Sequence, residues 1–170
     1  MPRMTFPVRQ ATARDAPAIA LVAAVAWRDT YAGLLRSDTI ETFIERAYSI
    51  ERLERRINRD TFLLALRDDQ VVAFCDAAEA ESEAGAHVDL YAIYALPEVR
   101  GQGAGTALLT ELQARFPSQP IAAEVLLGNR KGEVFYEHRG FVTRERIDTE
   151  LFGESVVERR WWLAPLAATS

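Results

Sequence analysis

The sequence is poor in the residues that build disulfides and metal centres. It contains one cysteine, Cys75, and two histidines, His87 and His138, among 170 residues. A single cysteine excludes an internal disulfide and fits a reducing compartment, which indicates the cytoplasm. Because no cysteine, histidine and carboxylate residues cluster at ligand spacing, we expect no metal site. We interpret Cys75, which lies in an apolar run, as a small buried residue and not as a nucleophile.

Long hydrophobic runs and an excess of positive charge are also missing. No apolar run approaches the ~20 residues that span a bilayer, and no basic leader precedes an apolar stretch. We therefore expect neither a membrane protein nor a secreted one. The net charge of −5 argues against nucleic acid as a partner. The length predicts a single domain over residues 1–170, and a composition of 49% apolar and 26% charged residues is typical of a globular domain.

Three glycines, in contrast, lie close together in a turn that can bind a ligand. Residues 100–106 read Arg-Gly-Gln-Gly-Ala-Gly-Thr, after an apolar strand at 88–96 and before an amphipathic helix. With few Cβ atoms, the amides of this turn can approach a ligand closely, and the helix start adds free N–H groups. Such a strand–turn–helix is typical of phosphate binding. It is not a P-loop, because the only lysine, Lys131, lies elsewhere, and a dinucleotide fingerprint would need glycine in place of Thr106.

A second informative segment covers residues 129–141. It follows the strand-like run 121–127 and predicts a short helix that Asn129 caps and Gly140 ends. Asn129 can be a helix cap alone, and Phe135 and Tyr136 can be a packed helix face alone. The two segments lie about 25 residues apart, with a predicted helix and a predicted strand between them.

The rest of the chain alternates strands and helices without repeats. Periodicity predicts a strand at 8–11, a helix from 15–17 to Gly33, and a second helical region that runs through 40–44 and continues over 49–59. It then predicts strands at 61–67 and 70–77, an exposed acidic loop at 78–86, and a closing hairpin of 141–150 and 154–163.

The spacing Arg-x-x-Gly-x-Gly, from Arg100 to Gly105, resembles the acyl-CoA pyrophosphate loop of the GNAT superfamily of N-acetyltransferases. Residues 129–141 resemble the GNAT pattern Asn-x-x-Ala-x-x-Phe-Tyr-x-x-x-Gly-Phe, with Gly132 in place of alanine. Residues 26–35 look like a common bacterial subgroup. The resemblance implies an α/β (α+β) fold, the GNAT acyl-CoA N-acyltransferase fold, with a mixed central sheet of about seven strands and helices on both faces.

The resemblance also implies acetyl-CoA as co-substrate and names the residues that would bind it. Asn129 would hold the pantetheine arm, and backbone groups after the middle of the strand would hold the thioester. The residues expected to bind the cofactor are Ile93, Tyr94, Ala95, Arg100, Gly101, Gln102, Gly103, Ala104, Gly105, Thr106, Asn129 and Phe135. The basic side chains that flank them and suit an anionic cofactor are Arg100, Arg130, Lys131 and Arg139.

Two residues are expected to carry the chemistry. The resemblance implies that Tyr136 protonates the departing thiolate. Asp89 stands where many relatives carry glutamate, so it would act as general base or ammonium anchor, its short side chain favouring a bridging water. A strand-edge charge bonded to its neighbours is the alternative. Strand alternation predicts that Asp89, Tyr91, Ile93 and Ala95 share one face.

The acceptor is expected under the first helices. Trp27 and Tyr31 lie four residues apart on one helical face, and with Tyr91 they are the predicted substrate-binding residues. Core packing is an equal alternative for Trp27.

These observations favour an enzyme that moves the acetyl group of acetyl-CoA to a primary amine of a small molecule or peptide by direct attack in a ternary complex. A non-catalytic acyl-CoA sensor or interaction module is the alternative, and an unrelated nucleotide-binding domain lacks its ribose or Mg²⁺ carboxylate. The protein is expected to be a monomer or homodimer, since the last strand can pair across a dimer.

Overall fold

A mixed seven-stranded sheet forms the centre of the molecule in the computed structural model, which describes residues 4–166. The strand order is β1-β2-β3-β4-β5-β7-β6, and only β4 and β5 run parallel to each other. The strands are β1 (Val8–Gln10), β2 (Thr61–Arg67), β3 (Gln70–Ser82), β4 (Gly85–Ala95), β5 (Ile121–Leu126), β6 (Val142–Leu151) and β7 (Glu154–Leu163).

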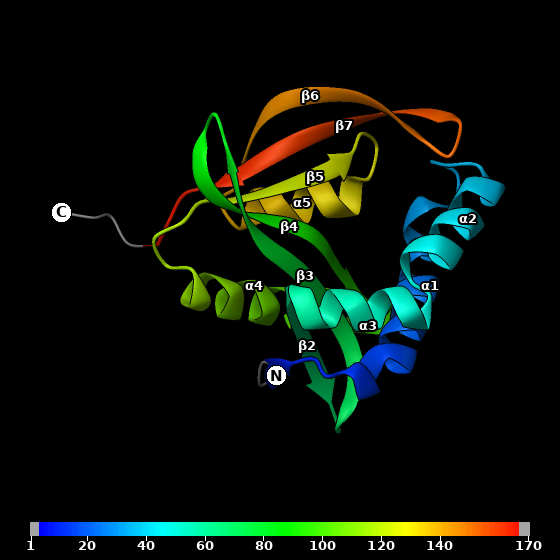
Figure 1. Ribbon diagram of the computed structural model, residues 1–170, viewed down its shortest axis with the longest axis vertical. Coiled ribbons are helices and arrows are strands. Elements are labelled where there is room, and N and C mark those ends of the chain that lie inside the picture. The colour runs from blue at the N-terminus through cyan, green and yellow to red at the C-terminus, as the bar shows by residue number, and fades with distance from the viewer. Residues whose placement is uncertain (1–3, 167–170) are drawn as a thin grey trace.

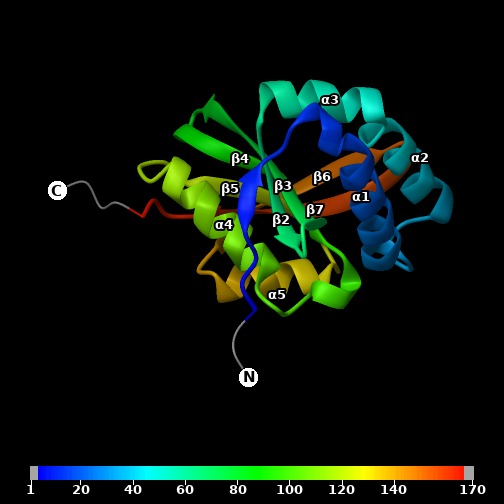
Figure 2. The same ribbon diagram turned by 90° about the horizontal axis from the view of Figure 1, so that it is seen from below.

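Helices cover both faces of this sheet, as the sequence predicted (Figures 1 and 2). The helices are α1 (Ala16–Tyr31), α2 (Ser37–Ala47), α3 (Ile50–Arg59), α4 (Ala104–Arg115) and α5 (Arg130–His138). Helices α1 to α3 bury Ile19 and Leu53 against Phe74 of β3 on one face. Helix α4 buries Leu108 and Leu112 on the other, where α5 also packs. Each fully buried side chain of this kind contributes about 1.5–3 kcal/mol. The predicted mixed α+β fold is confirmed.

Strands β4 and β5 pair over a short stretch and then diverge. Their ladder consists of three pairs, the last being Leu90 with Ala123. Beyond it, Ile93 and Ala95 remain paired with β3, but within residues 4–166 no strand pairs with β4 on its other side. We call residues 93–96 the free β4 edge. Its unpaired peptide groups are available to a ligand.

A β-bulge in β4 corrects one expectation. Asp76 of β3 pairs with Ala92, but the next residue, Ala77, pairs with Leu90, so that Tyr91 is the extra residue. An inserted residue reverses the alternation of side chains between the two faces.

The predicted common face of Asp89, Tyr91, Ile93 and Ala95 is therefore wrong. Ile93 and Ala95 pack against the core under α4, whereas Asp89 faces the side that α1 to α3 cover. Tyr91 is turned outward, with 56% of its surface exposed. The thioester role is expected of backbone groups, and the peptide groups of Ile93 and Ala95 point away from β3, whose Val72 carbonyl binds the Leu96 amide.

Two boundaries also differ from the prediction. Residues 78–86 are not a loop, because β3 continues to Ser82, β4 begins at Gly85, and Ala80 pairs with His87. The second helical region is two helices, because the Ser49 hydroxyl accepts a hydrogen bond from the Arg52 amide at 3.3 Å and starts a new helix.

A buried carboxyl lies beneath α3. Asp76 is 1% exposed, and its Oδ2 accepts a hydrogen bond from Arg56 Nε at 2.9 Å. The other oxygen, Oδ1, has no hydrogen-bond partner in the described part of the chain. Burial raises the pKa of Asp76 to about 7, and the neighbouring Asp60 carboxyl raises it further. The folded protein therefore holds a proton there that the unfolded chain would release.

This proton makes stability depend on pH. The folded-state pKa lies above the unfolded value, so the contribution is complete below about pH 4 and is lost as pH rises toward and past 7. We expect the melting temperature to fall from pH 5 to pH 8, and Asp76→Asn to flatten that slope by several degrees, since ~1 kcal/mol corresponds to roughly 2–4 °C. Thermal unfolding followed by circular dichroism measures it, with the exposed Asp38→Asn as control. Parallel curves for wild type and Asp76→Asn would contradict the assignment.

Candidate active site

The glycine turn leads directly into α4. Gly101 and Gly103 have φ angles of 77° and 104°, which side chains with a Cβ rarely adopt, and Gly103 is the N-cap residue. The first amides of α4 therefore have no carbonyl of their own helix to bond. Gln102 supports the turn by donating from Nε2 to the Glu98 carbonyl at 2.8 Å. The arrangement can bind an anion, as the sequence predicted for this segment.

Gly105 has a packing role that its place in the motif did not indicate. A Cβ there would lie 2.6 Å from Cε2 of Phe135, so the absent side chain lets α5 approach the start of α4. Arg139 covers the Phe135 ring at 3.9 Å and donates from Nε to the Thr106 hydroxyl at 3.0 Å. Phe135 and Thr106 thus join the two helices.

Arg100 is bound by the end of α1. Its guanidinium pairs with the Asp29 carboxylate and donates to the Thr30 hydroxyl at 3.3 Å. Lys131 at the start of α5 lies 3.2 Å from the same carboxylate. Hydrogen bonds from Arg100 and then Lys131 hold the pKa of Asp29 below its usual range. Asp29 therefore connects α1 to both predicted cofactor segments, a role that no local sequence signal could reveal.

Asn129 caps α5. Its Oδ1 accepts a hydrogen bond from the Gly132 amide at 3.1 Å. A Cβ on Gly132 would lie 2.7 Å from Nδ2 of Asn129, so glycine gives the amide group room that alanine would restrict. The side-chain amide also interacts with the Tyr31 hydroxyl, which brings α1 and α5 together at this point.

Aromatic residues line the α1 side of the free β4 edge. The hydroxyls of Tyr31 and Tyr94 are 2.8 Å apart, and burial raises the pKa of Tyr31 to about 12. The ring of Trp27 lies 4.3 Å from that of Tyr31 and stacks on Phe43 at 3.9 Å. Trp27 thus supports the wall as a core residue, and Tyr31 is the one whose polar group borders the site. The ring of Tyr94 faces α1, so only the backbone of Tyr94 belongs to the free β4 edge.

Tyr136 is almost fully buried. Its ring packs on Phe141 at 4.8 Å, and none of the described residues forms a hydrogen bond with its hydroxyl. Burial raises the pKa of Tyr136 strongly, and the negative charge of an ionised Tyr31 would raise it further. The phenol therefore remains protonated at neutral pH and can donate a hydrogen bond to an incoming group.

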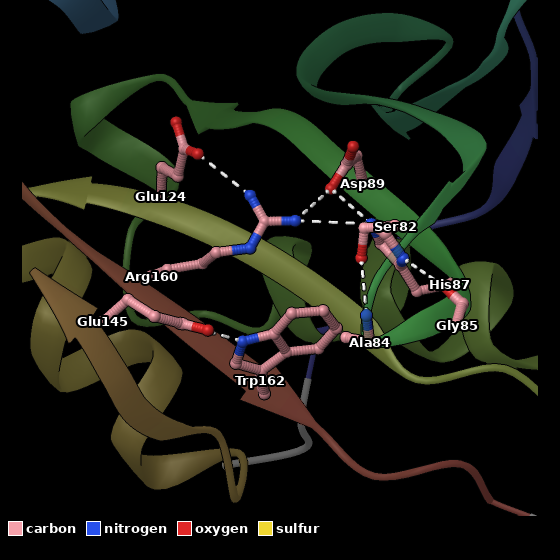
Figure 3. Close-up of polar contacts among 9 residues, drawn as sticks. All are labelled: Ser82, Ala84, Gly85, His87, Asp89, Glu124, Glu145, Arg160 and Trp162. Atoms are coloured by element: carbon pink, nitrogen blue, oxygen red, sulfur yellow. Dashed lines mark hydrogen bonds and ion pairs between the residues drawn. The ribbon is translucent and has the colours of Figure 1, made fainter. Parts of the chain in front are cut away.

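Asp89 belongs to a charged network on the α1 side of the sheet (Figure 3). Arg160 of β7 donates from Nη2 to Asp89 Oδ1 at 2.8 Å and from Nη1 to Glu124 at 2.9 Å. His87 Nε2 lies 3.2 Å from the same Asp89 oxygen, and His87 Nδ1 bonds the Gly85 carbonyl at 2.9 Å. Asp89 is therefore a held carboxylate with a fixed direction.

Glu158 is a candidate that sequence reasoning missed. It is half-buried on β7, two residues before Arg160, and interacts with Glu124 of β5. Burial raises the pKa of Glu158 to about 7, and the negative charge of Glu124 adds to the shift. The charge of Glu158 also reaches Tyr31, so the two lie near each other. A carboxyl of this kind can exchange protons at neutral pH.

Tyr91 does not join the other expected acceptor residues. Because of the bulge, the Tyr91 side chain points into a separate surface cavity, which Asp60 and Glu79 also line.

Comparison with known proteins follows this geometry. The profile of the acetyltransferase (GNAT) family matches residues 23–141. The spermidine N(1)-acetyltransferase of Thermoplasma acidophilum is 26% identical over 164 residues, which cover 91% of this chain and 99% of that protein. The crystal structure of the PaiA N-acetyltransferase of the same organism with coenzyme A has a TM-score of 0.77 at 26% identity, covering 92% of this chain and 98% of its own. A GCN5-related N-acetyltransferase of Rhodopseudomonas palustris shares the fold, with a TM-score of 0.79 at 18% identity over 96% of this chain and 98% of its own.

Gly105→Ala tests the packing between α4 and α5. The added methyl group meets the Phe135 ring, and overpacking costs about 1–3 kcal/mol, against a gain of up to ~1 kcal/mol in helix propensity. We expect a lower melting temperature and weaker coenzyme A binding. In a Phe135→Ala background the same change should raise the melting temperature. A double-mutant cycle by thermal unfolding measures this, and additive effects would rule out the contact.

Proposed function

The chain belongs to the GNAT acetyltransferase family and is an acetyl-CoA-dependent N-acetyltransferase, and on this premise we propose that it acetylates a primary amine of a small molecule or peptide by direct attack in a ternary complex. The observation that carries the proposal is the free β4 edge, which lies beside the protonated Tyr136 and the aromatic wall of α1.

In this proposal acetyl-CoA follows the two motif segments. The pyrophosphate binds the glycine turn and the first amides of α4, where the helix dipole and free N–H groups favour negative charge. The pantetheine arm runs past Asn129 along the free β4 edge, where the amides of Ile93 and Ala95, which point away from β3, bond its carbonyls. The relative crystallised with coenzyme A supports this cofactor.

Tyr136 acts on the leaving group. The departing thiolate needs a proton, and burial keeps the Tyr136 phenol protonated until that moment. Because this hydrogen bond strengthens as charge develops on sulfur, it should contribute to the transition state more than to cofactor binding.

Two carboxylates act on the amine. An alkylammonium has a pKa near ~10 and must lose a proton before it attacks. We assign Asp89, held by Arg160, to orient the ammonium directly or through a water, and Glu158 to receive the proton. The Glu158 pKa of about 7 lets the carboxylate form accept a proton at neutral pH and release it to solvent afterwards.

The acceptor and the cellular setting complete the proposal. A relative named as a spermidine acetyltransferase supports a small aliphatic amine as acceptor. Among residues 4–166 no helix combines the length and the apolar character needed to cross a bilayer. Cys75 is a buried free thiol, and burial raises its pKa to about 12, so it is chemically quiet. We place the enzyme in the cytoplasm.

Tyr136→Phe tests the reaction. We expect wild type to release coenzyme A from acetyl-CoA in the presence of amines, and Tyr136→Phe to lower kcat by roughly 10²–10³-fold with little change in the Kd of acetyl-CoA. Thiol detection across an amine panel measures turnover, and calorimetry measures binding. Binding without turnover on any amine would favour an acyl-CoA sensor, and loss of binding in Tyr136→Phe would refute its role as general acid.

Glu158→Gln tests the proton acceptor. A base acts in its deprotonated form, so kcat/KM should rise with pH through about 7, the pKa of Glu158. Burial and then the neighbouring Glu124 carboxyl raise the pKa of Glu158 to this value. Glu158→Gln should lower the rate and remove the rising limb, which a pH–rate profile between pH 5.5 and 9 would record. An unchanged limb would exclude Glu158.

A further inference from the structure

A surface cavity of about 590 Å³ lies apart from the cofactor segments. Asp60 and Glu79 supply carboxylates to its wall, Tyr91 and Phe116 supply aromatic rings, and Arg59 lies beside Asp60. We call it the Tyr91 cleft.

The Tyr91 cleft exists because β3 is longer than its neighbour β2. Strand β2 begins at Thr61, which pairs with Ala77, whereas β3 runs on to Ser82 with no β2 residue beside it. The free edge of β3 and the outward-turned Tyr91 leave the hollow next to the end of α3. Glu79 is fixed there, since its Oε1 accepts a hydrogen bond from Gln119 Nε2 at 2.6 Å.

Acidic groups outnumber basic ones at the wall of the cleft, where Asp60 and Glu79 face one arginine, Arg59. Burial raises the pKa of Tyr91, and the negative charges of Asp89 and Asp60 raise it further. Arg59 is itself neutralised by Asp60, with Nε 2.7 Å from the carboxylate. The unpartnered Oδ1 of the buried Asp76 lies behind Asp60, with which its carboxyl interacts.

This chemistry suits an ammonium group. Carboxylates attract it, and an aromatic face attracts a cation through the quadrupole of the ring. In this cleft a hollow, two aromatic rings and two carboxylates occur together.

The cleft is also connected to the reacting end of the site. Tyr91 precedes Tyr94 by three residues on the same strand, and a strand advances ~3.3 Å per residue, so the two residues lie roughly 10 Å apart along β4. Asp89 lies on the same strand. A chain with amino groups at both ends could follow β4 and fill both places.

We propose that the Tyr91 cleft is a subsite for the distal ammonium of an elongated diamine or polyamine, whose terminal primary amine is acetylated at the free β4 edge. The inference rests on the proposed function for its reacting end. It makes chain length and a second positive charge the properties by which the enzyme selects its acceptor.

Steady-state kinetics with spermidine and n-butylamine test the subsite. We expect wild type to prefer the triamine, and Glu79→Gln and Tyr91→Ala each to lower the triamine-to-monoamine ratio of kcat/KM by about 5–10-fold, mainly through the KM of the triamine. Glu81→Gln is the matched control, because Glu81 is an exposed acid two residues farther along β3 and does not line the cleft. It should leave the ratio unchanged.

Calorimetry of spermidine with the coenzyme A complex separates the two ideas. If acetyl transfer occurs but the ratio is the same in both cleft variants, the subsite is refuted and the transferase stands. If no amine is acetylated, yet spermidine binds wild type and binds Glu79→Gln about 5–10-fold more weakly, the cleft stands and the proposed function fails. Equal spermidine binding in wild type and both variants would overturn the subsite regardless of turnover.

Discussion

The separation of β4 from β5 after Leu90 is the constraint on which the rest of the site depends. A central strand that lacks a neighbour on one side leaves the peptide N–H and C=O groups of that side unbonded, which is costly unless water or a ligand satisfies them. An arm that itself contains amides can replace the missing strand, and the first turns of α4 and α5 stand nearby to receive its anionic and polar ends. In the proposed binding mode, one interruption in the sheet therefore accounts both for the cofactor and for the place where its reactive end stops.

Contacts among α1, α4 and α5 fix the arrangement of the elements around the free β4 edge. Gly105 lets Phe135 pack close, which joins α5 to α4, and Asp29 binds Arg100 and Lys131, which joins α1 to both. Each ion pair is partly exposed and contributes little stability on its own. Their shared effect is geometric, because α1 brings Tyr31 to the free edge at the same point where the glycine turn begins. Cofactor and acceptor sites are thus mechanically connected, and a change at Asp29 would reach both.

Sequence reasoning succeeded where function depends on neighbours in the chain. The glycine turn, the cap at Asn129 and the fold follow from local spacing, and the structure shows their expected geometry. It failed where distant residues meet. Arg160 reaches Asp89 across 71 residues, and the bulge at Tyr91 depends on the register with β3. The error at 78–86 had a visible signal, since alanine and glutamate alternate there with the period of a strand. Acidic composition was given too much weight.

Side chains of the same chemical type differ in protonation here because they differ in burial and in their neighbours. Tyr136 and Tyr91 are both phenols, yet one is enclosed and remains a proton donor, while the other is half exposed and offers a ring face. Asp89 and Glu158 are both carboxylates on the same side of the sheet. Arg160 compensates the charge of Asp89, whereas Glu158 has Glu124 beside it and so retains a proton near neutrality. A carboxylate with a bound arginine is suited to orienting a cation, and one with a shared proton is suited to moving a proton. The proposed direction of proton transfer, from the amine toward Glu158 and from Tyr136 toward sulfur, rests on these environments and not on residue type.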